Sequence, residues 1–189
     1  MQNIPELNGA LASLSAALSE LGLRYALIGG IAVILRGYDR ATQDVDAVVL
    51  DSDETLPAIL KTFERHGLQL RIADAEAFAR RNRVILLQAS DGTGIDVSMG
   101  LLPFETELVE RATLEPLTHA IEVPVATAED LIIMKLVAAR DRDLDDVRRL
   151  IELHPNLNGG RIRKIVSEYA EALDQPEIVH HLDAIVGHS

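Results

Sequence analysis

The sequence predicts an α/β (α+β) protein, with a small mixed sheet flanked by helices over residues 1–125 and a helical bundle over residues 126–189. Two stretches indicate the sheet. An apolar run over residues 25–28 ends at a pair of glycines, and a run over residues 44–50 combines two aspartates with aliphatic residues. From Thr127 onward the composition is helical to the end of the chain, which indicates the bundle.

The first predicted helix covers residues 5–21, where leucines recur every three or four positions, and Gly22 follows its end. The strand over residues 25–28 then turns sharply into a short helix that stops at Gly37. The strand over residues 44–50 comes next. This order predicts a strand, a helix and a second strand in close succession.

A hairpin is predicted around Asp91-Gly92, a dipeptide that favours tight turns between strands. The two strands that it joins cover residues 83–88 and 94–97. The other expected elements are a strand over residues 68–72 and helices over residues 54–66, 74–80, 103–111, 131–140, 144–153, 160–173 and 177–186.

Single residues add detail at element ends. Asp53 is placed to cap the helix that follows it. Because Pro124 has no N–H to donate, we expect residues 121–125 to form an edge strand. Thr127, with Asp130 three positions later, resembles a capping box at the start of the first bundle helix.

The Gly29-Gly30 pair marks a place where a ligand can approach the backbone closely. Glycine accepts dihedral angles that other residues avoid, and it has no side chain in the way. The N–H groups at the start of the following helix, together with its dipole, favour an anion such as phosphate. The turn therefore predicts a phosphate site.

Three aspartates are the candidate metal ligands. Asp44 and Asp46 are two positions apart in a predicted strand, so their carboxylates point to one face, and Asp96 lies on another predicted strand. Carboxylate pairs suit Mg²⁺. Two-metal phosphoryl transfer uses ions about 3.5–4 Å apart, held by such groups. Taken alone, an Asp-x-Asp triplet such as Asp44 to Asp46 is more often a pair of solvated carboxylates at a strand edge. The glycine turn upstream and Asp96 downstream favour the metal site here.

The amino-acid composition restricts which partners the protein is expected to bind. The net charge of −12 repels a phosphate backbone, so long nucleic acid is disfavoured, whereas a tRNA end or a nucleotide carried with Mg²⁺ is compatible. The absence of cysteine rules out disulfides and fits the cytoplasm. The longest apolar stretch, residues 25–35, is too short to cross a bilayer, so no membrane association is expected.

Together, Gly29-Gly30, Arg40-Ala41-Thr42 and Asp44-Val45-Asp46 resemble the signature of the nucleotidyltransferase fold, the DNA polymerase β superfamily. The form G-G-x-A-V…R-x-T-x-D-V-D is most similar to the AbiEii-type group, which includes toxins of type IV toxin–antitoxin systems. A later run, KLVAARDRDLDD over residues 135–146, resembles the helical motif of that group. The resemblance covers most of residues 25–150.

The resemblance implies an enzyme that moves a nucleotidyl group from a nucleoside triphosphate (NTP) to an acceptor and releases pyrophosphate. The implied catalytic residues, which would also hold two Mg²⁺ ions, are Asp44, Asp46 and Asp96. Asp96 is also the implied base for an acceptor hydroxyl. The implied nucleotide-binding residues are Gly29, Gly30, Arg40, Thr42 and Lys135. The wider superfamily usually has a serine after the first glycine of this turn. This chain continues with Gly30-Ile31 instead and lacks that hydroxyl.

Lys135 has two interpretations. Its ammonium can reach the acidic site and offset phosphate charge, or its stem can lie at a core edge with the ammonium in solvent. The acidic cluster over residues 141–146 is either a second metal site or, as we expect, a solvated turn with helix caps.

Three functions are compatible with these features. The first is a Mg²⁺-dependent nucleotidyltransferase that acts as the toxin of a type IV pair, with an antitoxin protein as partner. The second is an antibiotic-type enzyme that adenylylates a small-molecule hydroxyl, since an acidic cleft would suit an aminoglycoside cation. The third is a binding module for a nucleotide or a protein partner, with a decayed site.

Overall fold

The computed structural model describes residues 4–50, 55–118 and 121–187. Asp53, the expected helix cap, lies outside these ranges. The chain divides into two compact units, one of Met1–Leu35 and Asp39–Ala126 and the other of Arg36–Tyr38 and Thr127–Ser189. That residues 1–125 and 126–189 are separate domains stays a prediction.

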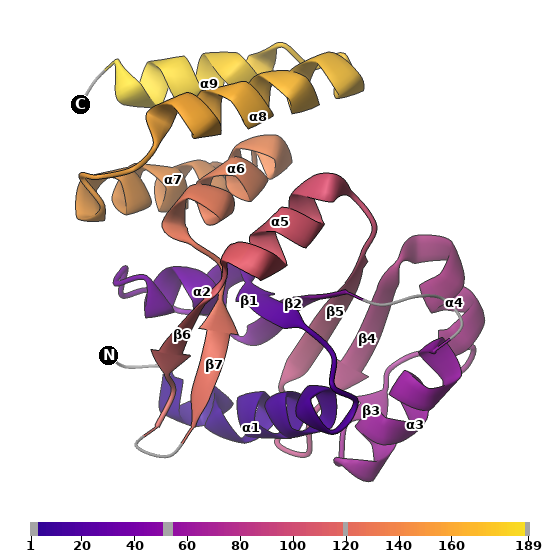
Figure 1. Ribbon diagram of the computed structural model, residues 1–189. Helices are drawn as coiled ribbons and strands as arrows, with labels where there is room; N and C mark the ends of the chain where they lie inside the picture. The colour runs from indigo at the N-terminus through magenta and orange to yellow at the C-terminus, as the bar shows by residue number, and fades with distance from the viewer. Residues whose placement is uncertain (1–3, 51–54, 119–120, 188–189) are drawn as a thin grey trace. The chain divides into compact units, whose positions relative to one another are not determined.

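The first unit is a mixed sheet with helices packed on it (Figure 1). Its helices are α1 (Ile4–Glu20), α2 (Gly29–Leu35), α3 (Leu56–Arg65), α4 (Ala75–Asn82) and α5 (Pro103–Arg111). Its strands are β1 (Tyr25–Ile28), β2 (Asp44–Leu50), β3 (Gln69–Leu70), β4 (Val84–Gln88), β5 (Gly94–Gly100), β6 (Thr113–Pro116) and β7 (Glu122–Val125).

The strands form one sheet in the order β3-β4-β5-β2-β1-β7-β6. The pairs β2–β5 and β1–β7 are parallel, and the other neighbouring pairs are antiparallel. The predicted fold class, a mixed sheet flanked by helices and followed by a helical region, is confirmed.

The two faces of the central strands differ in burial. Side chains along β2, β4 and β5 alternate between the faces. One face carries aliphatic side chains that are at most 2% exposed: Val45, Ala47, Val49, Ile85, Leu87, Ile95, Val97 and Met99. The other face carries Asp44, Asp46 and Asp96, none of which is buried. The alternation therefore places all three candidate carboxylates on the face that is less fully covered.

Helices α1 and α3 contribute much of the apolar core of this unit. Leu11, Leu14 and Leu18 recur along one side of α1 and are at most 1% exposed. Ile59 and Phe63, one turn apart on α3, are fully buried, and the two helices contact each other. The predicted leucine stripe is therefore the buried face of α1.

Strand β7 is not the edge strand that Pro124 led us to expect. It lies between β1 and β6, and β6 is the edge. The N–H of Ala126 donates to the Leu27 carbonyl, and alternate backbone N–H groups of a strand point to the same side. The nitrogen of Pro124 therefore faces β1, where the pairing is limited to Leu27 and Val125. The short β1–β7 ladder is what accommodates the proline.

The second unit consists of α6 (Ala128–Ala138), α7 (Asp141–Leu153), α8 (Gly159–Leu173) and α9 (Glu177–Val186). Helix α6 buries residues on all sides and contacts the other three helices, as expected for a central helix. The predicted cap at Thr127 is present, because its Oγ1 accepts from the Asp130 N–H at 3.2 Å.

The expectation of a solvated turn over residues 141–146 is wrong. These residues form the first turns of α7, and the Asp143 and Asp146 side chains are buried. The reason is the buried ammonium of Lys135, which pairs with both carboxylates. Buried carboxylates without such a partner would be strongly unfavourable.

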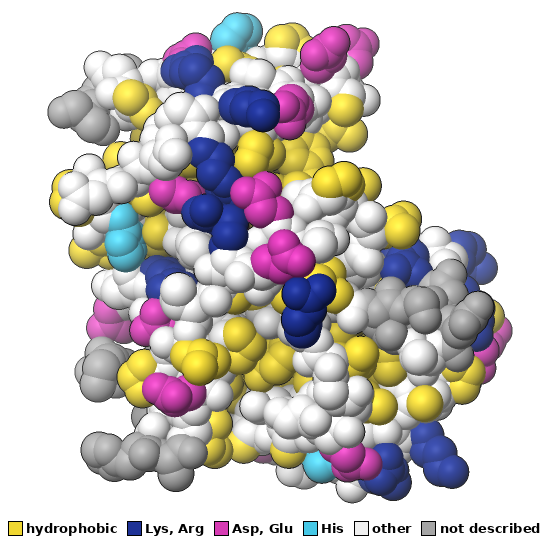
Figure 2. All heavy atoms as spheres, in the orientation of Figure 1, with side chains coloured by type: hydrophobic (Ala, Val, Ile, Leu, Met, Phe, Trp, Pro, Cys, Tyr) yellow, Lys and Arg dark blue, Asp and Glu magenta, His cyan; other side chains and the backbone are white. Residues whose placement is uncertain are grey.

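On the molecular face in Figure 2, basic and acidic side chains are interspersed and do not gather by sign. No helix within residues 4–50, 55–118 and 121–187 is long and apolar enough to cross a membrane.

Candidate active site

The glycine turn joins β1 directly to α2, without an intervening loop. Gly29 has a φ of +63°, a conformation that side chains disfavour. Ile28, just before it, is the register partner of Asp46 on β2. The carboxylate of Asp46 lies so close to Gly29 that a Cβ at this position would overlap with it. Glycine is therefore required at position 29 for two reasons: the positive φ, and the space that the Asp46 carboxylate occupies.

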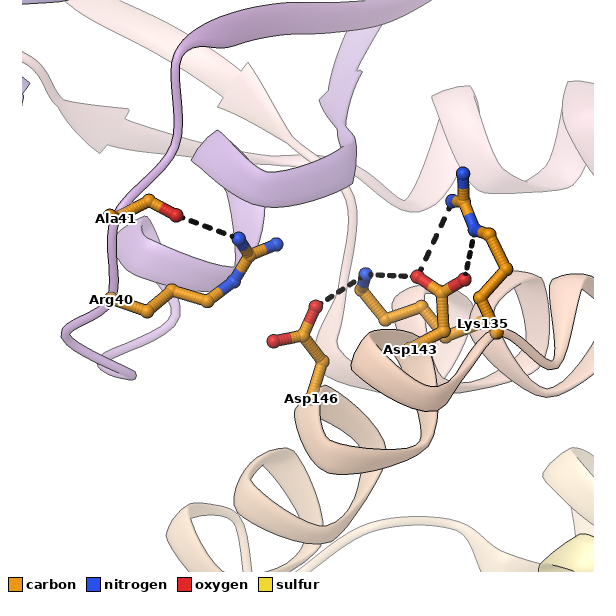
Figure 3. Close-up of polar contacts among 6 residues, drawn as sticks. Arg40, Ala41, Lys135, Asp143 and Asp146 are labelled. Atoms are coloured by element: carbon orange, nitrogen blue, oxygen red, sulfur yellow. Dashed lines mark hydrogen bonds and ion pairs between the residues drawn. The ribbon is translucent and has the colours of Figure 1, made fainter.

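Gly30 provides a second close approach. A Cβ on Gly30 would lie 2.5 Å from the Thr42 hydroxyl and 2.9 Å from Arg40 Nη2. Arg40 Nη1 donates to the Ala41 carbonyl at 2.9 Å (Figure 3), and Thr42 Oγ1 lies 3.4 Å from the Asp44 carbonyl. The structure therefore brings four residues predicted to contact the nucleotide to one place: Gly29, Gly30, Arg40 and Thr42.

The acidic residues meet across the parallel pair β2–β5. Asp46 is directly opposite Asp96, and Asp44 is directly opposite Gly94. A Cβ on Gly94 would lie 2.5 Å from Asp44 Oδ1, so the absence of a side chain at Gly94 makes room for that carboxylate. Because opposite residues share a face, the three aspartates form one acidic surface on the sheet.

A basic residue joins this acidic surface. Arg71, directly after β3, forms an ion pair with Asp96 through Nη2 and Oδ1. Its Nη1 would lie 3.5 Å from a Cβ on Gly94. Arg71 was not among the residues predicted for the site.

The residue types at this site fit Mg²⁺. Within the described ranges, no three His, Cys, Asp or Glu side chains are gathered closely enough to hold a metal ion. However, Mg²⁺ commonly uses one or two protein carboxylates and takes its other ligands from water and substrate phosphates. Asp44 and Asp46 supply two such carboxylates beside the glycine turn. That Asp96 joins them as a ligand stays a prediction.

Lys135 lies on α6 in the second unit, and its side chain is buried. Its Nζ pairs with the Asp143 and Asp146 carboxylates (Figure 3). The distances are 2.6 Å to Asp146 Oδ2 and 3.0 Å to Asp143 Oδ1. Arg140 Nε also donates to Asp143, at 2.6 Å. The interpretation of Lys135 as an ammonium reaching solvent is therefore wrong; its predicted contact with a triphosphate stays a prediction.

The pKa of Asp143 depends on opposing effects within this cluster. Burial raises the pKa of its carboxyl, but hydrogen bonds from Arg140 and Lys135 and their positive charges lower it by more. The net result is a pKa below the ordinary value of 3.8. The carboxylate is therefore the stable form of Asp143 at neutral pH.

The second unit also holds the segment that leads toward Arg40. His154 Nε2 lies 2.9 Å from the Arg36 carbonyl, and the Arg149 guanidinium is 6.0 Å from the centre of the Tyr38 ring. Both contacts fix residues 36–38 against α7.

Comparison with known proteins identifies the family. A family model described as "Nucleotidyltransferase of unknown function (DUF6036)" matches residues 6–180, which include every site residue named above. The chain belongs to this family. The expected nucleotidyltransferase-type family is thus confirmed for DUF6036, whereas the narrower AbiEii-type assignment stays a prediction. No curated protein matches the chain significantly.

Solved structures share the fold of this DUF6036 protein at low sequence identity. The solution structure of the antibiotic-resistance factor ANT(2'')-Ia has a TM-score of 0.62 and 16% identity, over 96% of this chain and 99% of that chain. A crystal structure of ANT(2'')-Ia in complex with adenylyl-2''-tobramycin has a TM-score of 0.60 and 15% identity, over 88% and 98%. The lincosamide antibiotic adenylyltransferase LnuA, bound to lincomycin, has a TM-score of 0.53 and 13% identity, over 76% and 95%. At these identities the likeness establishes the fold.

Two site residues, Gly94 and Arg71, were not predicted from the sequence, for different reasons. Gly94 is two positions before Asp96, so strand alternation alone would have placed it on the acidic face. Arg71 follows a strand of only two residues, and its position depends on the pairing of β3 with β4 and of β4 with β5. That pairing register was not available from the sequence pattern.

Proposed function

We propose that this DUF6036 protein is an enzyme that transfers a nucleotidyl group from an NTP to a hydroxyl group of an acceptor. One observation carries the proposal. Asp46 touches the glycine turn at Gly29 and is the register partner of Asp96. Asp46 therefore links the acidic surface to the glycine turn, which would bind phosphate, and transfer of a phosphoryl-type group requires such an arrangement.

Different residues of the chain would bind the triphosphate and accept the proton. The backbone at Gly29 and Gly30, with the Arg40 guanidinium and the Thr42 hydroxyl, would bind the triphosphate. Asp96 would accept the proton of the acceptor hydroxyl. The acceptor oxygen forms a bond to the α-phosphorus, the bond from that phosphorus to the bridging oxygen breaks, and pyrophosphate leaves with the electron pair.

Mg²⁺ would be held by Asp44 and Asp46, with Asp96 as a further ligand and two ions in all. When bound, the Mg²⁺ ions would neutralise negative charge on the phosphates and polarise the α-phosphate. Asp44 and Asp46 would hold Mg²⁺ beside the glycine turn, while the Arg40 guanidinium would offset phosphate charge directly.

For the acceptor, we favour a cationic small molecule with a free hydroxyl. Of the structural neighbours, ANT(2'')-Ia is an antibiotic-resistance factor whose crystal structure contains adenylyl-2''-tobramycin, and LnuA is a lincosamide antibiotic adenylyltransferase bound to lincomycin. The net charge of −12 and the acidic surface of Asp44, Asp46 and Asp96 favour a cation over an anion.

A toxin of a type IV toxin–antitoxin pair is the second candidate. Its support is the segment from Gly29 to Asp46, which has the G-G-x-A-V…R-x-T-x-D-V-D form of the AbiEii-type group. The acceptor would then be a cellular macromolecule, for instance a tRNA end, and a co-expressed antitoxin protein would be the partner.

The test uses NTPs that carry a radioactive label on the α-phosphate, one base at a time, with Mg²⁺ and three sets of acceptors. These are aminoglycosides and lincosamides, total tRNA, and the proteins of a cell extract. The matched control is the Asp44→Asn, Asp46→Asn double variant, checked for folding by circular dichroism. Pyrophosphate release is measured in parallel.

Label on an antibiotic would support the small-molecule reaction, and label on tRNA or protein would support the toxin reaction. Transfer that persists in the double variant would contradict the proposed site. If the parent protein binds NTP with Mg²⁺ but labels no acceptor, the chain is better explained as a binding module.

A further inference from the structure

Arg71 belongs to one continuous row of residues across the sheet. Its N–H donates to the Leu86 carbonyl at 3.0 Å, so it continues the β3–β4 pairing one residue beyond β3. Leu86 is the register partner of Asp96, and Asp96 is the partner of Asp46. Residues in such a row share a face. The backbone register alone therefore places Arg71 on the acidic face.

The side chains agree with the register. Arg71 passes over Leu86 to form an ion pair with Asp96. It also reaches the space above Gly94, where Asp44 Oδ1 lies 2.5 Å from the position that a Cβ would take. Arg71 is thus a basic residue in ion-pair contact with this acidic surface.

Folding stability does not explain this pair well. The Arg71 side chain is 35% exposed and the Asp96 side chain is 42% exposed. Ion pairs with this exposure are screened by water and contribute little to the free energy of unfolding. The effect of this pair on binding is easier to explain than an effect on stability. An arginine that the strand register places beside three carboxylates changes which ions those carboxylates can bind.

We propose that Arg71 is a positioning residue that acts as a built-in counter-ion. It holds the Asp96 carboxylate and competes with a divalent cation for the acidic surface of Asp44, Asp46 and Asp96. This inference rests on the proposed function, because it assumes that the acidic surface binds a divalent cation. A guanidinium beside the carboxylates repels that cation and occupies Asp96 Oδ1, so a cation that takes this oxygen as a ligand must displace Arg71.

The experiment measures Mn²⁺ binding without nucleotide by electron paramagnetic resonance titration, at fixed ionic strength. Arg71→Gln removes the counter-ion, and Arg71→Lys keeps the positive charge. The matched control is Arg80→Gln, which removes an equal charge from another exposed ion pair of the first unit, Arg80–Glu76. Circular dichroism establishes that each variant is folded.

We expect Arg71→Gln to bind Mn²⁺ about five- to tenfold more tightly than the parent, since one nearby positive charge is lost in a partly exposed setting. Arg80→Gln should stay within about twofold of the parent, and Arg71→Lys should lie close to it. In an Asp96→Asn background, the gain from Arg71→Gln should largely disappear.

Equal or weaker Mn²⁺ binding by Arg71→Gln, with clear binding by the parent, would overturn the inference and leave the proposed function standing. A gain of equal size in Arg80→Gln would also overturn it, because the effect would then be one of net charge. If neither the parent nor any variant binds Mn²⁺ without nucleotide, the inference fails, whereas the proposed function, in which substrate phosphates supply further ligands, is tested separately with nucleotide present.

Discussion

The Asp46 carboxylate lies against the backbone of Gly29, in the space that any other side chain at this position would fill. We therefore predict that Gly29→Ala destabilises the protein and also abolishes NTP binding. The strain of a positive φ alone costs about 1 kcal/mol or somewhat more. The displacement of Asp46 adds to this cost and disturbs the site.

The chain offers a matched control at Gly22. Its φ is +65°, close to the +63° of Gly29, and nothing lies within 4 Å of a Cβ placed there. Gly22→Ala should show the backbone strain alone and keep NTP binding. Chemical denaturation and calorimetric titration measure the two effects. If both variants lose the same stability and both bind NTP, the contact between Gly29 and Asp46 has no role.

Lys135 is predicted to stabilise the second unit. Its buried ammonium pairs with Asp143 and Asp146, so Lys135→Met leaves two buried carboxylates without that partner. We expect a loss of about 3–5 kcal/mol in the free energy of unfolding. Lys164→Met is the control, since its side chain is 76% exposed and its separation from Glu168 is 3.9 Å. Similar losses in the two variants would contradict the prediction.

The sequence-based role of Lys135 predicts a further effect under conditions where the variant is folded. If the ammonium offsets phosphate charge, Lys135→Ala should weaken triphosphate binding by about 1–3 kcal/mol. Nucleoside without phosphates should bind the variant and the parent alike. Equal changes for both ligands, or none, would make Lys135 a structural residue only.

Asp143 should make the stability of the second unit depend on pH in acid. Its pKa in the folded state lies below the ordinary value of 3.8 expected in the unfolded chain. Its contribution to stability is then fully present above that value and is lost as the pH falls through the folded-state pKa. Urea denaturation of the parent and of Asp143→Asn should give stabilities that converge below about pH 4. A constant difference down to pH 2–3 would be the contrary result.

Asp96 is predicted to act in transfer more than in nucleotide binding. Its register partner is Asp46, but its carboxylate is directed to Arg71. Asp96→Ala should therefore still bind NTP and Mg²⁺ but transfer no nucleotidyl group to an acceptor that the parent modifies. Single-turnover kinetics after an equilibrium binding measurement would separate the two steps. Full transfer by this variant would remove Asp96 from the mechanism.

Local signals in the sequence predicted the parts of the site that depend on neighbouring residues. The two glycines before α2, the spacing of Asp44 and Asp46, and the Asp91-Gly92 hairpin each specify geometry over a few positions. Features that depend on which strands pair were not predictable in this way. Arg71 joins the acidic surface through two strand pairings, and β7 tolerates Pro124 because its ladder with β1 is short.

The burial of charged side chains is the second feature of the structure that the sequence pattern did not predict. From the sequence, the aspartates of residues 141–146 were expected in solvent, and the Lys135 ammonium was expected either in solvent or at the acidic site. Their burial follows from the meeting of α6 and α7, which makes the ammonium and the two carboxylates mutual partners. Helical periodicity places each residue on its own helix, but it does not show that the two helices pack with these faces together.

Calorimetric titration of the parent and of Asp46→Asn with a non-hydrolysable ATP analogue, with and without Mg²⁺, tests the central claim most directly. Asp46 links the glycine turn to the acidic surface, so the parent should bind the analogue only with Mg²⁺. Asp46→Asn should not bind it, while keeping its circular dichroism spectrum and a melting temperature equal to or above that of the parent. Unchanged Mg²⁺-dependent binding by a folded Asp46→Asn variant would contradict the assignment of the site.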